Sequence, residues 1–154
     1  MLTLTRKTEY ALIALSHLTQ HPEDCTSARC VAARYRLSVP LLMNVLKLLT
    51  QRGLAVSVRA PRGGYRLAVD PHEITLDDVV RAVEGPVQLV LCEQGKGAEE
   101  GETVCELMSS CPVRSPIRRI QEKLDSFFKE VSLADLVLDS EVCPSAALSA
   151  TQGD

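Results

Sequence analysis

Apolar residues in the first third of the chain recur at the spacing of a helix. Four of them lie three or four positions apart: Ala11, Ala14, Leu15 and Leu18. This spacing predicts an amphipathic helix over residues 6–20. A shorter helix is predicted after it, as far as Tyr35. Its N-cap is expected to be Thr26 or Ser27, because a hydroxyl oxygen there can accept a hydrogen bond from the first turn.

A third helix is predicted from Pro40 to about Arg52. Proline suits a first helical turn, and the following Gly53 suits a C-cap. The apolar stripe of this helix comprises Leu42, Val45, Leu46 and Leu49. A turn over residues 36–38 separates it from the second helix. Helix, turn and helix at this spacing is the arrangement that places a recognition helix in a DNA major groove.

After Gly53 the pattern changes from helical spacing to alternation of apolar and polar side chains. The alternating apolar positions are Val56 and Val58, then Tyr65, Leu67 and Val69. The sequence Ala60-Pro61-Arg62-Gly63-Gly64 lies between the two runs, and its glycines can adopt the positive φ of a tight turn. We therefore predict a two-stranded hairpin with a basic tip, the wing of a winged helix.

The second half opens with a short helix whose start is capped. Thr75 and Asp78 have the spacing of a capping box, and Asp77 would favour the positive end of the helix dipole. Gly85-Pro86 marks a predicted boundary, and residues 87–91 are expected to form an apolar strand or connector. A last helical turn is predicted far downstream, over residues 133–138, with Ser132 and Asp135 as its cap.

A long helix is predicted between these elements, over residues 113–131. Its apolar residues lie three and four apart on an otherwise charged surface. This apolar seam comprises Ile117, Ile120, Leu124, Phe127 and Val131. Such a seam needs a partner, and with few aromatic residues to build a core we expect the same helix of a second copy. The alternative is a helix packed inside one subunit.

These patterns together predict a mainly α fold with a small β-hairpin wing. A winged helix-turn-helix domain is expected over residues 1–85. A cysteine-loop region with a long dimerisation helix is expected over residues 86–138. The tail over residues 139–154 is small and polar, so we expect it to be disordered.

Charge is divided unevenly between the two halves. Residues 1–70 hold ten Lys/Arg and four Asp/Glu, a net of +6, whereas residues 71–154 hold seven and sixteen, a net of −9. A basic half suits the phosphates of double-stranded DNA, and the acidic half does not. No apolar run reaches the roughly 18 residues of a membrane span, and the N-terminus lacks the pattern of a signal peptide. We therefore expect a cytoplasmic protein without membrane contact, whose thiols are reduced.

Three of the six cysteines lie in a segment rich in Gly and Glu. Cys92, Cys105 and Cys111 have the spacing C-x12-C-x5-C, which differs from the C-x2-C knuckle of structural zinc. An irregular loop lets several thiolates converge on one inorganic centre. An iron–sulfur cluster is therefore favoured over zinc, and over thiols that bind nothing. Cys30, on the second helix, is expected instead to be a small core residue.

Candidate DNA contacts follow from position and side-chain chemistry. Asn44, on the third helix, can pair bidentately with adenine, and Lys47 can bind phosphate. An arginine flanked by glycine at the hairpin tip can enter a narrow minor groove. The full set of candidates is Thr26, Ser27, Ser38, Pro40, Leu41, Asn44, Lys47, Arg59, Arg62, Gly63 and Tyr65.

Three segments resemble a known family. They are LSVPLLMNVLKLLTQRGLAVSVRAPRGGYRLA, ITLDDVVRAVEG and CPVRSPIRRIQEKLDSFFKEVSLADL. They are similar to the Rrf family of bacterial winged-helix transcriptional regulators, which includes the IscR-, NsrR- and RsrR-like iron–sulfur regulators. The resemblance covers residues 1–138. It implies a homodimeric repressor that binds a palindromic operator, and a cluster held by Cys92, Cys105 and Cys111.

The fourth ligand of the cluster separates the subgroups of this family. IscR-like members have a His three residues after the last Cys, where this chain has Arg114. NsrR-like and RsrR-like members take a carboxylate from the first helix of the other subunit, and Glu9 occupies that position. RsrR-like members add a His one turn later, where Ile13 stands. The resemblance therefore implies three cysteines and Glu9 of the other subunit, with 2Fe-2S and 4Fe-4S clusters both open.

The function expected from these features is transcription regulation by a repressor. Its operator binding would be switched by an iron–sulfur cluster that senses nitric oxide, redox state or iron–sulfur status. One alternative is a winged-helix repressor that uses its cysteines for thiol redox sensing or zinc. An alternative of another class is a small iron–sulfur electron-transfer or assembly protein, against which the basic wing argues. An enzyme is not expected, since the sequence contains no nucleophile–base pairing and no glycine loop that cradles phosphate.

Overall fold

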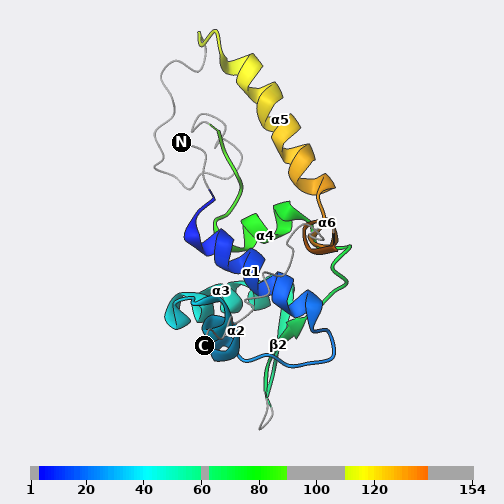
Figure 1. Cartoon of the computed structure of the whole chain (residues 1–154). Coiled ribbons are helices and arrows are strands. Elements are labelled where there is room, and N and C mark those ends of the chain that lie inside the picture. Colours follow the sequence, from blue (N-terminus) through cyan, green and yellow to red (C-terminus); the bar gives the residue numbers. More distant parts are fainter. Residues whose placement is uncertain (1–3, 60–62, 90–109, 139–154) are drawn as a thin grey trace, which may run out of the picture.

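The structure is a computed structural model that describes residues 4–59, 63–89 and 110–138. Its elements, in chain order, are α1 (Arg6–Gln20), α2 (Ala28–Tyr35), α3 (Val39–Gln51), β1 (Ala55–Val58), β2 (Gly64–Leu67), α4 (Leu76–Val83), α5 (Arg114–Glu130) and α6 (Leu133–Leu138). The predicted fold class, mainly α with a small hairpin, is confirmed. Figure 1 shows the hairpin extending from one end of the molecule and α5 projecting from the opposite end.

Local capping interactions set the boundaries of the first two helices. The Thr5 hydroxyl accepts a hydrogen bond of 3.2 Å from the Lys7 amide at the start of α1. The Ser27 hydroxyl accepts one of 3.1 Å from the Cys30 amide in α2, so the N-cap is the second of the two predicted candidates. Arg36 ends α2 in the left-handed conformation, with φ of 54°, and thereby starts the turn into α3.

The third helix begins one residue earlier than expected. Ser38 is its N-cap, and Pro40 lies in the first turn, where a missing amide hydrogen removes no helical hydrogen bond. Gly53 follows the helix with φ of 73°, a conformation that favours glycine. All four residues of the predicted stripe are buried: Leu42, Val45, Leu46 and Leu49. The stripe therefore attaches α3 to the core.

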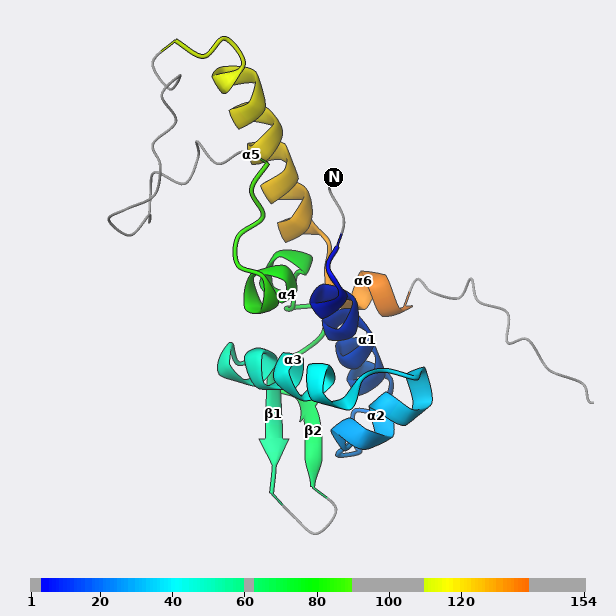
Figure 2. The ribbon, with the colours of Figure 1, turned by 90° about the vertical axis from the view of Figure 1, so that its left-hand side faces the viewer.

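The hairpin pairs β1 and β2 in antiparallel orientation, with Ala55 opposite Leu67. β2 ends at Leu67, whereas the alternating pattern continues to Val69 in the sequence. The backbone pairing extends one residue further, through a hydrogen bond of 3.1 Å from the Ala68 amide to the Leu54 carbonyl, and the chain bends at Ala68 and Val69. In Figure 2 α3 lies across the base of both strands, so the hairpin extends from beneath the third helix.

The starts of α4 and α6 are capped in the same way and lie beside each other. The predicted capping box is confirmed: the Thr75 hydroxyl accepts from the Asp78 amide at 3.1 Å, and the Asp78 carboxylate accepts from the Thr75 amide at 3.0 Å. Ser132 and Asp135 make the equivalent pair at the start of α6. An isolated antiparallel bridge joins Thr75 to Ser132. The chain therefore returns to α4 after the long excursion of α5.

One cluster of buried side chains joins the N-terminal helices to α4 and α6. Leu15 of α1 and Ile74, just before α4, are completely enclosed in it. Leu133 and Val137 of α6 belong to the same cluster, although they follow α5 in the chain. The predicted boundary at residues 85–86 stays a prediction, but α6 packs on the N-terminal side of it. Residues 87–89, the described part of the predicted strand or connector, are a connector.

The apolar seam of α5 is only partly covered by its own chain. Ile120 and Phe127 are 56% and 55% exposed, and the other three members are half-buried. The helix packs on α4 and extends beyond it, as both views show (Figures 1 and 2).

Among the helices that the structure describes, none combines the length and the apolar character needed to cross a bilayer.

Candidate DNA-binding surface and cysteine segment

The outer side of α3 presents several of the predicted DNA contacts to solvent. Four of them are exposed on this side: Ser38, Pro40, Asn44 and Lys47. Leu41 was expected among the outward residues, but it is half-buried and packs against the core. It lies four residues before the buried Val45, and therefore on the flank of the apolar stripe. Leu41 supports the helix more than it extends the exposed surface.

Two exposed arginines of this region were not among the predicted contacts. Arg36 lies in the turn between α2 and α3, two residues before Ser38. Arg66 lies on β2, opposite Val56 of β1. Both belong to the basic half of the chain, so the charge asymmetry could have indicated them. Their turn and strand positions place two more positive charges near the exposed side of α3 and on the hairpin.

The wing is basic in its described part. Arg59 is exposed directly after β1, and Gly63 is half-buried directly before β2. Arg62 lies outside the described residues, and its contact with DNA stays a prediction. Arg59 and Arg66 nevertheless give the hairpin two exposed guanidinium groups, the side chains that most often enter or border a DNA groove.

The outer edge of β2 is joined to the start of α2 by Thr26 and Tyr65. Their backbones exchange two hydrogen bonds, of 3.0 Å from the Thr26 amide and 2.9 Å from the Tyr65 amide. Thr26 is buried, so it lacks the exposed side chain that its predicted DNA contact needs. Tyr65 is half-buried against the core. A Cβ on Gly64 would lie 2.5 Å from the Thr26 carbonyl carbon, which explains why glycine is required there.

A side chain of α1 is hydrogen-bonded to the N-cap residue of α3. The backbone amide of Ser38 donates a hydrogen bond of 3.1 Å to the hydroxyl of Tyr10. Tyr10 is buried in the core, whereas its neighbour Glu9 is exposed in the first turn of α1. Successive residues of a helix point about 100° apart, so the two side chains leave α1 on different sides.

Of the three predicted thiolate ligands, only Cys111 lies within the described residues. It is half-buried, three residues before α5, and is in no disulfide with the other described cysteines. Cys92 and Cys105 lie outside the described residues. Within the described ranges no three His, Cys, Asp or Glu side chains lie close enough to hold a metal. A site built on Cys111 therefore requires residues beyond those ranges or a second subunit.

Cys30 was expected in the core, and this expectation is wrong. The residue is exposed on α2. The buried residues of α2 are Ala28, Val31 and Ala32, so Cys30 lies on the opposite side of this short helix. A run of small residues does not reveal which side of an eight-residue helix faces inward.

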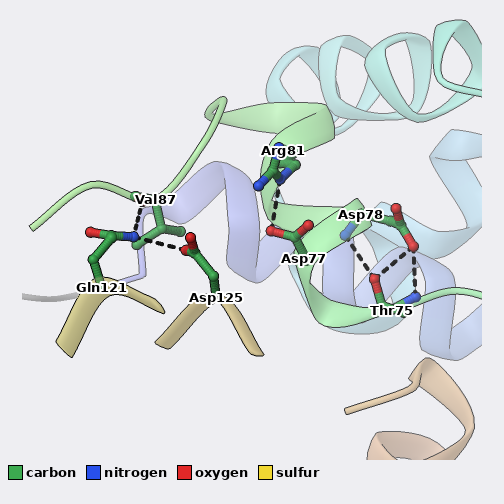
Figure 3. Close-up of polar contacts among 7 residues, drawn as sticks. All are labelled: Thr75, Asp77, Asp78, Arg81, Val87, Gln121 and Asp125. Carbon is green, nitrogen blue, oxygen red and sulfur yellow. Dashed lines mark hydrogen bonds and ion pairs between the residues drawn. The ribbon is translucent and has the colours of Figure 1, made fainter. Parts of the chain in front are cut away.

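The entry to the cysteine segment is fixed to α5 by Gln121 (Figure 3). The Gln121 side chain is buried; its Oε1 accepts from the Leu89 amide at 2.9 Å, and its Nε2 donates to the Val87 carbonyl at 2.8 Å. The amide group thus pairs with the backbone as a neighbouring strand would. Nε2 also donates to the Asp125 carboxylate at 2.8 Å, which fixes the orientation of the amide.

The segment between Leu89 and Cys111 is therefore attached to α5 at both sides. Leu89 is bonded to Gln121, and Cys111 precedes the first turn of the helix. Gln121 and Arg114 are separated by about 10 Å along the axis, at 1.5 Å per residue. The two attachment points of the cysteine-bearing segment consequently lie on one rigid element.

An ion pair on α4 lies close to this attachment (Figure 3). Arg81 Nε and Asp77 Oδ1 are 2.8 Å apart, one helical turn from each other. The hydrogen bond to Asp77 raises the pKa of Arg81. Asp77, predicted to interact with the helix dipole, is buried and is neutralised mainly by this arginine.

Within one chain, Glu9 and Cys111 lie near opposite ends of α5. Thr5, Thr8 and Phe128 line one cavity of about 370 Å³, so the first turn of α1 lies beside the C-terminal part of α5. Arg114 and Phe128 are about 21 Å apart along the helix axis, at 1.5 Å per residue. In Figure 1 the start of α5 lies at the end of that helix away from α1.

A buried histidine joins α1 to α2. His17 Nδ1 and the Tyr35 hydroxyl share a hydrogen bond of 3.2 Å. Burial lowers the pKa of His17, and the nearby His21 and Arg34 add to this effect. The His17 and His21 rings are 4.6 Å apart at their centroids. Burial at the junction of the two helices therefore favours the neutral form of His17.

Known proteins of the same architecture are transcriptional regulators. The model of the Rrf2 family, described as an iron-dependent transcriptional regulator, matches residues 4–139. The chain is 31% identical over 140 residues to the HTH-type transcriptional regulator IscR of Vibrio parahaemolyticus, which covers 90% of this chain and 79% of that protein. It is 31% identical over 134 residues to protein aau3 of Rhizobium meliloti, covering 87% and 84% respectively.

Solved structures give the same result. CymR (YrzC), the global cysteine regulator of B. subtilis, superposes with a TM-score of 0.69 at 27% identity, covering 92% of this chain and 100% of that one. IscR of T. potens superposes with a TM-score of 0.67 at 28% identity, covering 91% and 89%. The expected fold and the family resemblance are thereby confirmed. The chain belongs to the Rrf2 family of winged-helix transcriptional regulators.

Proposed function

We propose that this chain is a homodimeric repressor whose binding to operator DNA is switched by an iron–sulfur cluster. The observation that carries the proposal is the attachment of the cysteine segment to α5. Leu89 and Cys111, at its two ends, are held by the helix that also carries the partly uncovered apolar seam. A metal site and a subunit interface would thus share one structural support.

DNA recognition is assigned to α3 and the wing. Ser38, Asn44 and Lys47 are exposed on α3. Asn44 has the amide chemistry that reads adenine in the major groove, and Lys47 is suited to a phosphate. Arg59 and Arg66 provide positive charge on the hairpin. Two copies would read the two halves of a palindrome, about one helical turn apart.

The dimer is assigned to the apolar seam of α5. Ile120 and Phe127 are more than half exposed in the single chain, and burying them against a second seam would remove them from water. Two such helices packed antiparallel would bring the start of one α5 near the α1 of the other subunit. This supports Glu9 of the partner subunit as the fourth ligand, since Glu9 of the same chain lies far along α5.

The donor set fits an iron–sulfur cluster. Cys92, Cys105 and Cys111 would supply three thiolates, the ligand type that holds iron and sulfide. Glu9 is an exposed carboxylate, and would be the most readily exchanged of the four ligands. When bound, the cluster would supply a centre that reacts with nitric oxide or oxidants, so the signal would be nitric oxide, redox state or iron–sulfur status. Release of Glu9 would free the first turn of α1.

A modest coupling free energy between the cluster and operator binding is enough for a switch. A free-energy difference of about 1–3 kcal/mol between the two states changes operator affinity roughly 5- to 150-fold. The change would act on the relative position of two recognition helices, because half-sites at fixed separation tolerate little rotation.

The test is operator binding by the protein purified without oxygen, with and without its metal, at one fixed salt concentration. We expect iron and sulfide in the purified dimer, and different affinities for the two states. The triple variant Cys92→Ala, Cys105→Ala, Cys111→Ala should lose the iron and the difference. The matched control replaces the other three cysteines, Cys25, Cys30 and Cys143, and should keep both. Equal affinities of the two wild-type states would reject the switch.

The same experiment distinguishes the proposed function from the alternative hypotheses. Zinc without sulfide in the purified protein would favour a zinc-dependent regulator. Loss of binding after oxidation in the absence of any metal would favour a thiol sensor. Failure to bind any duplex in a salt-dependent manner would favour an iron–sulfur protein with no DNA role.

A further inference from the structure

We infer that Tyr10 is the positioning residue through which a movement of α1 reaches the recognition helix α3. This inference deepens the proposed function, and rests on it in taking Glu9 as a ligand. Tyr10 itself would touch neither metal nor DNA. Its hydroxyl would set where the N-terminus of α3 lies relative to the core.

The contact on which the inference rests is specific. Tyr10 is 8% exposed, and its hydroxyl accepts a hydrogen bond of 3.1 Å from the Ser38 amide. Ser38 is the N-cap of α3, and among the described residues its side chain accepts no capping hydrogen bond from the helix. Helix N-termini carry amides without intrahelical partners, so an added partner at the cap fixes the position of the first turn.

α1 is one continuous helix over Arg6–Gln20, so a displacement of Glu9 would carry Tyr10 with it. Ala11 and Ala14, the next residues on the inner side of α1, are completely buried, so the helix packs closely on the core. Its start is capped by Thr5, whose hydroxyl also donates to the Glu84 carboxylate at the end of α4. A rigid helix with Glu9 outside and Tyr10 inside converts an outward pull on one into a displacement of the other.

The residues that would feel this displacement are the predicted readers of DNA. Pro40 and Asn44 lie within two turns of Ser38 on the same helix. A bidentate hydrogen bond to a base edge requires heavy-atom distances near 3 Å and good alignment. A small shift of the α3 N-terminus would therefore weaken base recognition while leaving phosphate attraction nearly unchanged.

The chain provides a matched control in a second tyrosine. The Tyr35 hydroxyl also bonds to α1, through His17 Nδ1 at 3.2 Å, but its partner is not on α3. Tyr10→Phe and Tyr35→Phe each remove one hydroxyl and one hydrogen bond to another helix. A purely structural role would make the two variants behave alike.

The experiment uses the full-length protein and an operator obtained by selecting random-sequence duplexes with the wild type. Two ratios are measured for each variant at fixed salt. The first is the affinity for the operator relative to a scrambled duplex, in whichever state binds more tightly. The second is the affinity of the metal-loaded protein relative to the metal-free protein. Iron content and the thermal midpoint are recorded for each.

We expect Tyr10→Phe to lower the first ratio by about 5-fold or more and to bring the second close to one, a loss on the scale of ordinary allosteric coupling. Iron content and binding to the scrambled duplex should stay at the wild-type level. Tyr35→Phe should keep both ratios.

The inference is overturned if Tyr10→Phe retains both ratios, or if Tyr35→Phe loses them to the same degree. A wild type whose metal-loaded and metal-free forms bind equally would reject the proposed switch instead. The first ratio would then still decide whether Tyr10 positions α3, because it needs no metal.

Discussion

At the scale of single residues, His17 has an environment with a measurable consequence. It is almost enclosed between α1 and α2, hydrogen-bonded to Tyr35 and close to the positively charged Arg34. Burial lowers the pKa of His17 below its ordinary value of 6.5. The folded protein therefore binds a proton at this position less readily than the unfolded chain does.

We predict that the free energy of unfolding decreases as pH falls below about 6.5, the ordinary pKa of histidine. The unfolded chain binds more protons than the folded one in this range, so lower pH favours unfolding. His17→Gln should flatten this decrease between pH 7 and pH 5, measured by denaturant unfolding at each pH. His72→Gln, at an exposed histidine, serves as the control. Identical pH profiles for the wild type and His17→Gln would contradict the prediction.

Gly64 gives a second prediction at this scale. A Cβ there would lie 2.5 Å from both the carbonyl carbon and the carbonyl oxygen of Thr26. Gly64→Ala should therefore separate the wing from the start of α2, with a cost of about 1–3 kcal/mol, as for other forced contacts. Thermal unfolding and affinity for duplex DNA are the measurements. Ser57→Ala, exposed on the partner strand opposite Tyr65, should change neither.

At the scale of elements, α5 fixes the path of the connector through one side chain. Gln121 accepts from the Leu89 amide and donates to the Val87 carbonyl, with Asp125 holding its amide in place. Gln121→Glu would lack the Nε2 donor and would place a second carboxylate beside that of Asp125. We expect a loss of about 1–3 kcal/mol in stability, typical of a buried polar group left without its partner. Under the proposed function, iron retention should fall as well.

The matched control for this prediction is Glu122→Gln, which alters the neighbouring exposed residue by the reverse exchange. Protection of the Leu89 amide from hydrogen exchange reports the contact directly. Unchanged protection in Gln121→Glu would show that the connector is held by other groups.

Element boundaries could be predicted closely because their signals are local. The Thr75 and Asp78 pair and the glycine after α3 act within four residues, and the structure places both as expected. The side of α2 that faces inward could not be predicted, because a short helix of small residues has little periodic contrast; Cys30 was misplaced for this reason. β2 ends at Leu67 because the chain bends at Ala68 and Val69, and the alternation of apolar residues does not reveal this bend.

At the scale of the whole molecule, the hydrogen bonds that position the candidate site join residues that are distant in sequence. Tyr10 and Ser38 are 28 positions apart, and Leu89 and Gln121 are 32 apart. One sequence carries no signal of either contact, since tyrosine and glutamine are common in helices for many reasons. Charge and cysteine spacing predict candidate residue types for the site, which stay predictions; the contacts between the elements that carry them required the fold.

The assembly gives a prediction at the same scale. The apolar seam of α5 exposes Ile120 and Phe127 in the single chain. Ile120→Glu or Phe127→Glu should raise the dimer dissociation constant about 10-fold or more, because each removes roughly 1.5–3 kcal/mol of apolar burial. Sedimentation equilibrium measures it. Lys129→Glu, exposed on the other side of the helix, should leave it unchanged. A wild type that sediments as a monomer would contradict the assignment.

The double attachment of the cysteine segment to α5 also affects how the length of that segment can change during evolution. Residues inserted or deleted between two points anchored on one helix need not disturb anything packed elsewhere, and doubling such a stretch costs only about 0.6 kcal/mol of closure entropy. We therefore expect the spacing between Cys92 and Cys105 to tolerate changes in length. The amide of Gln121, by contrast, should vary little, since every such variant depends on the same anchor.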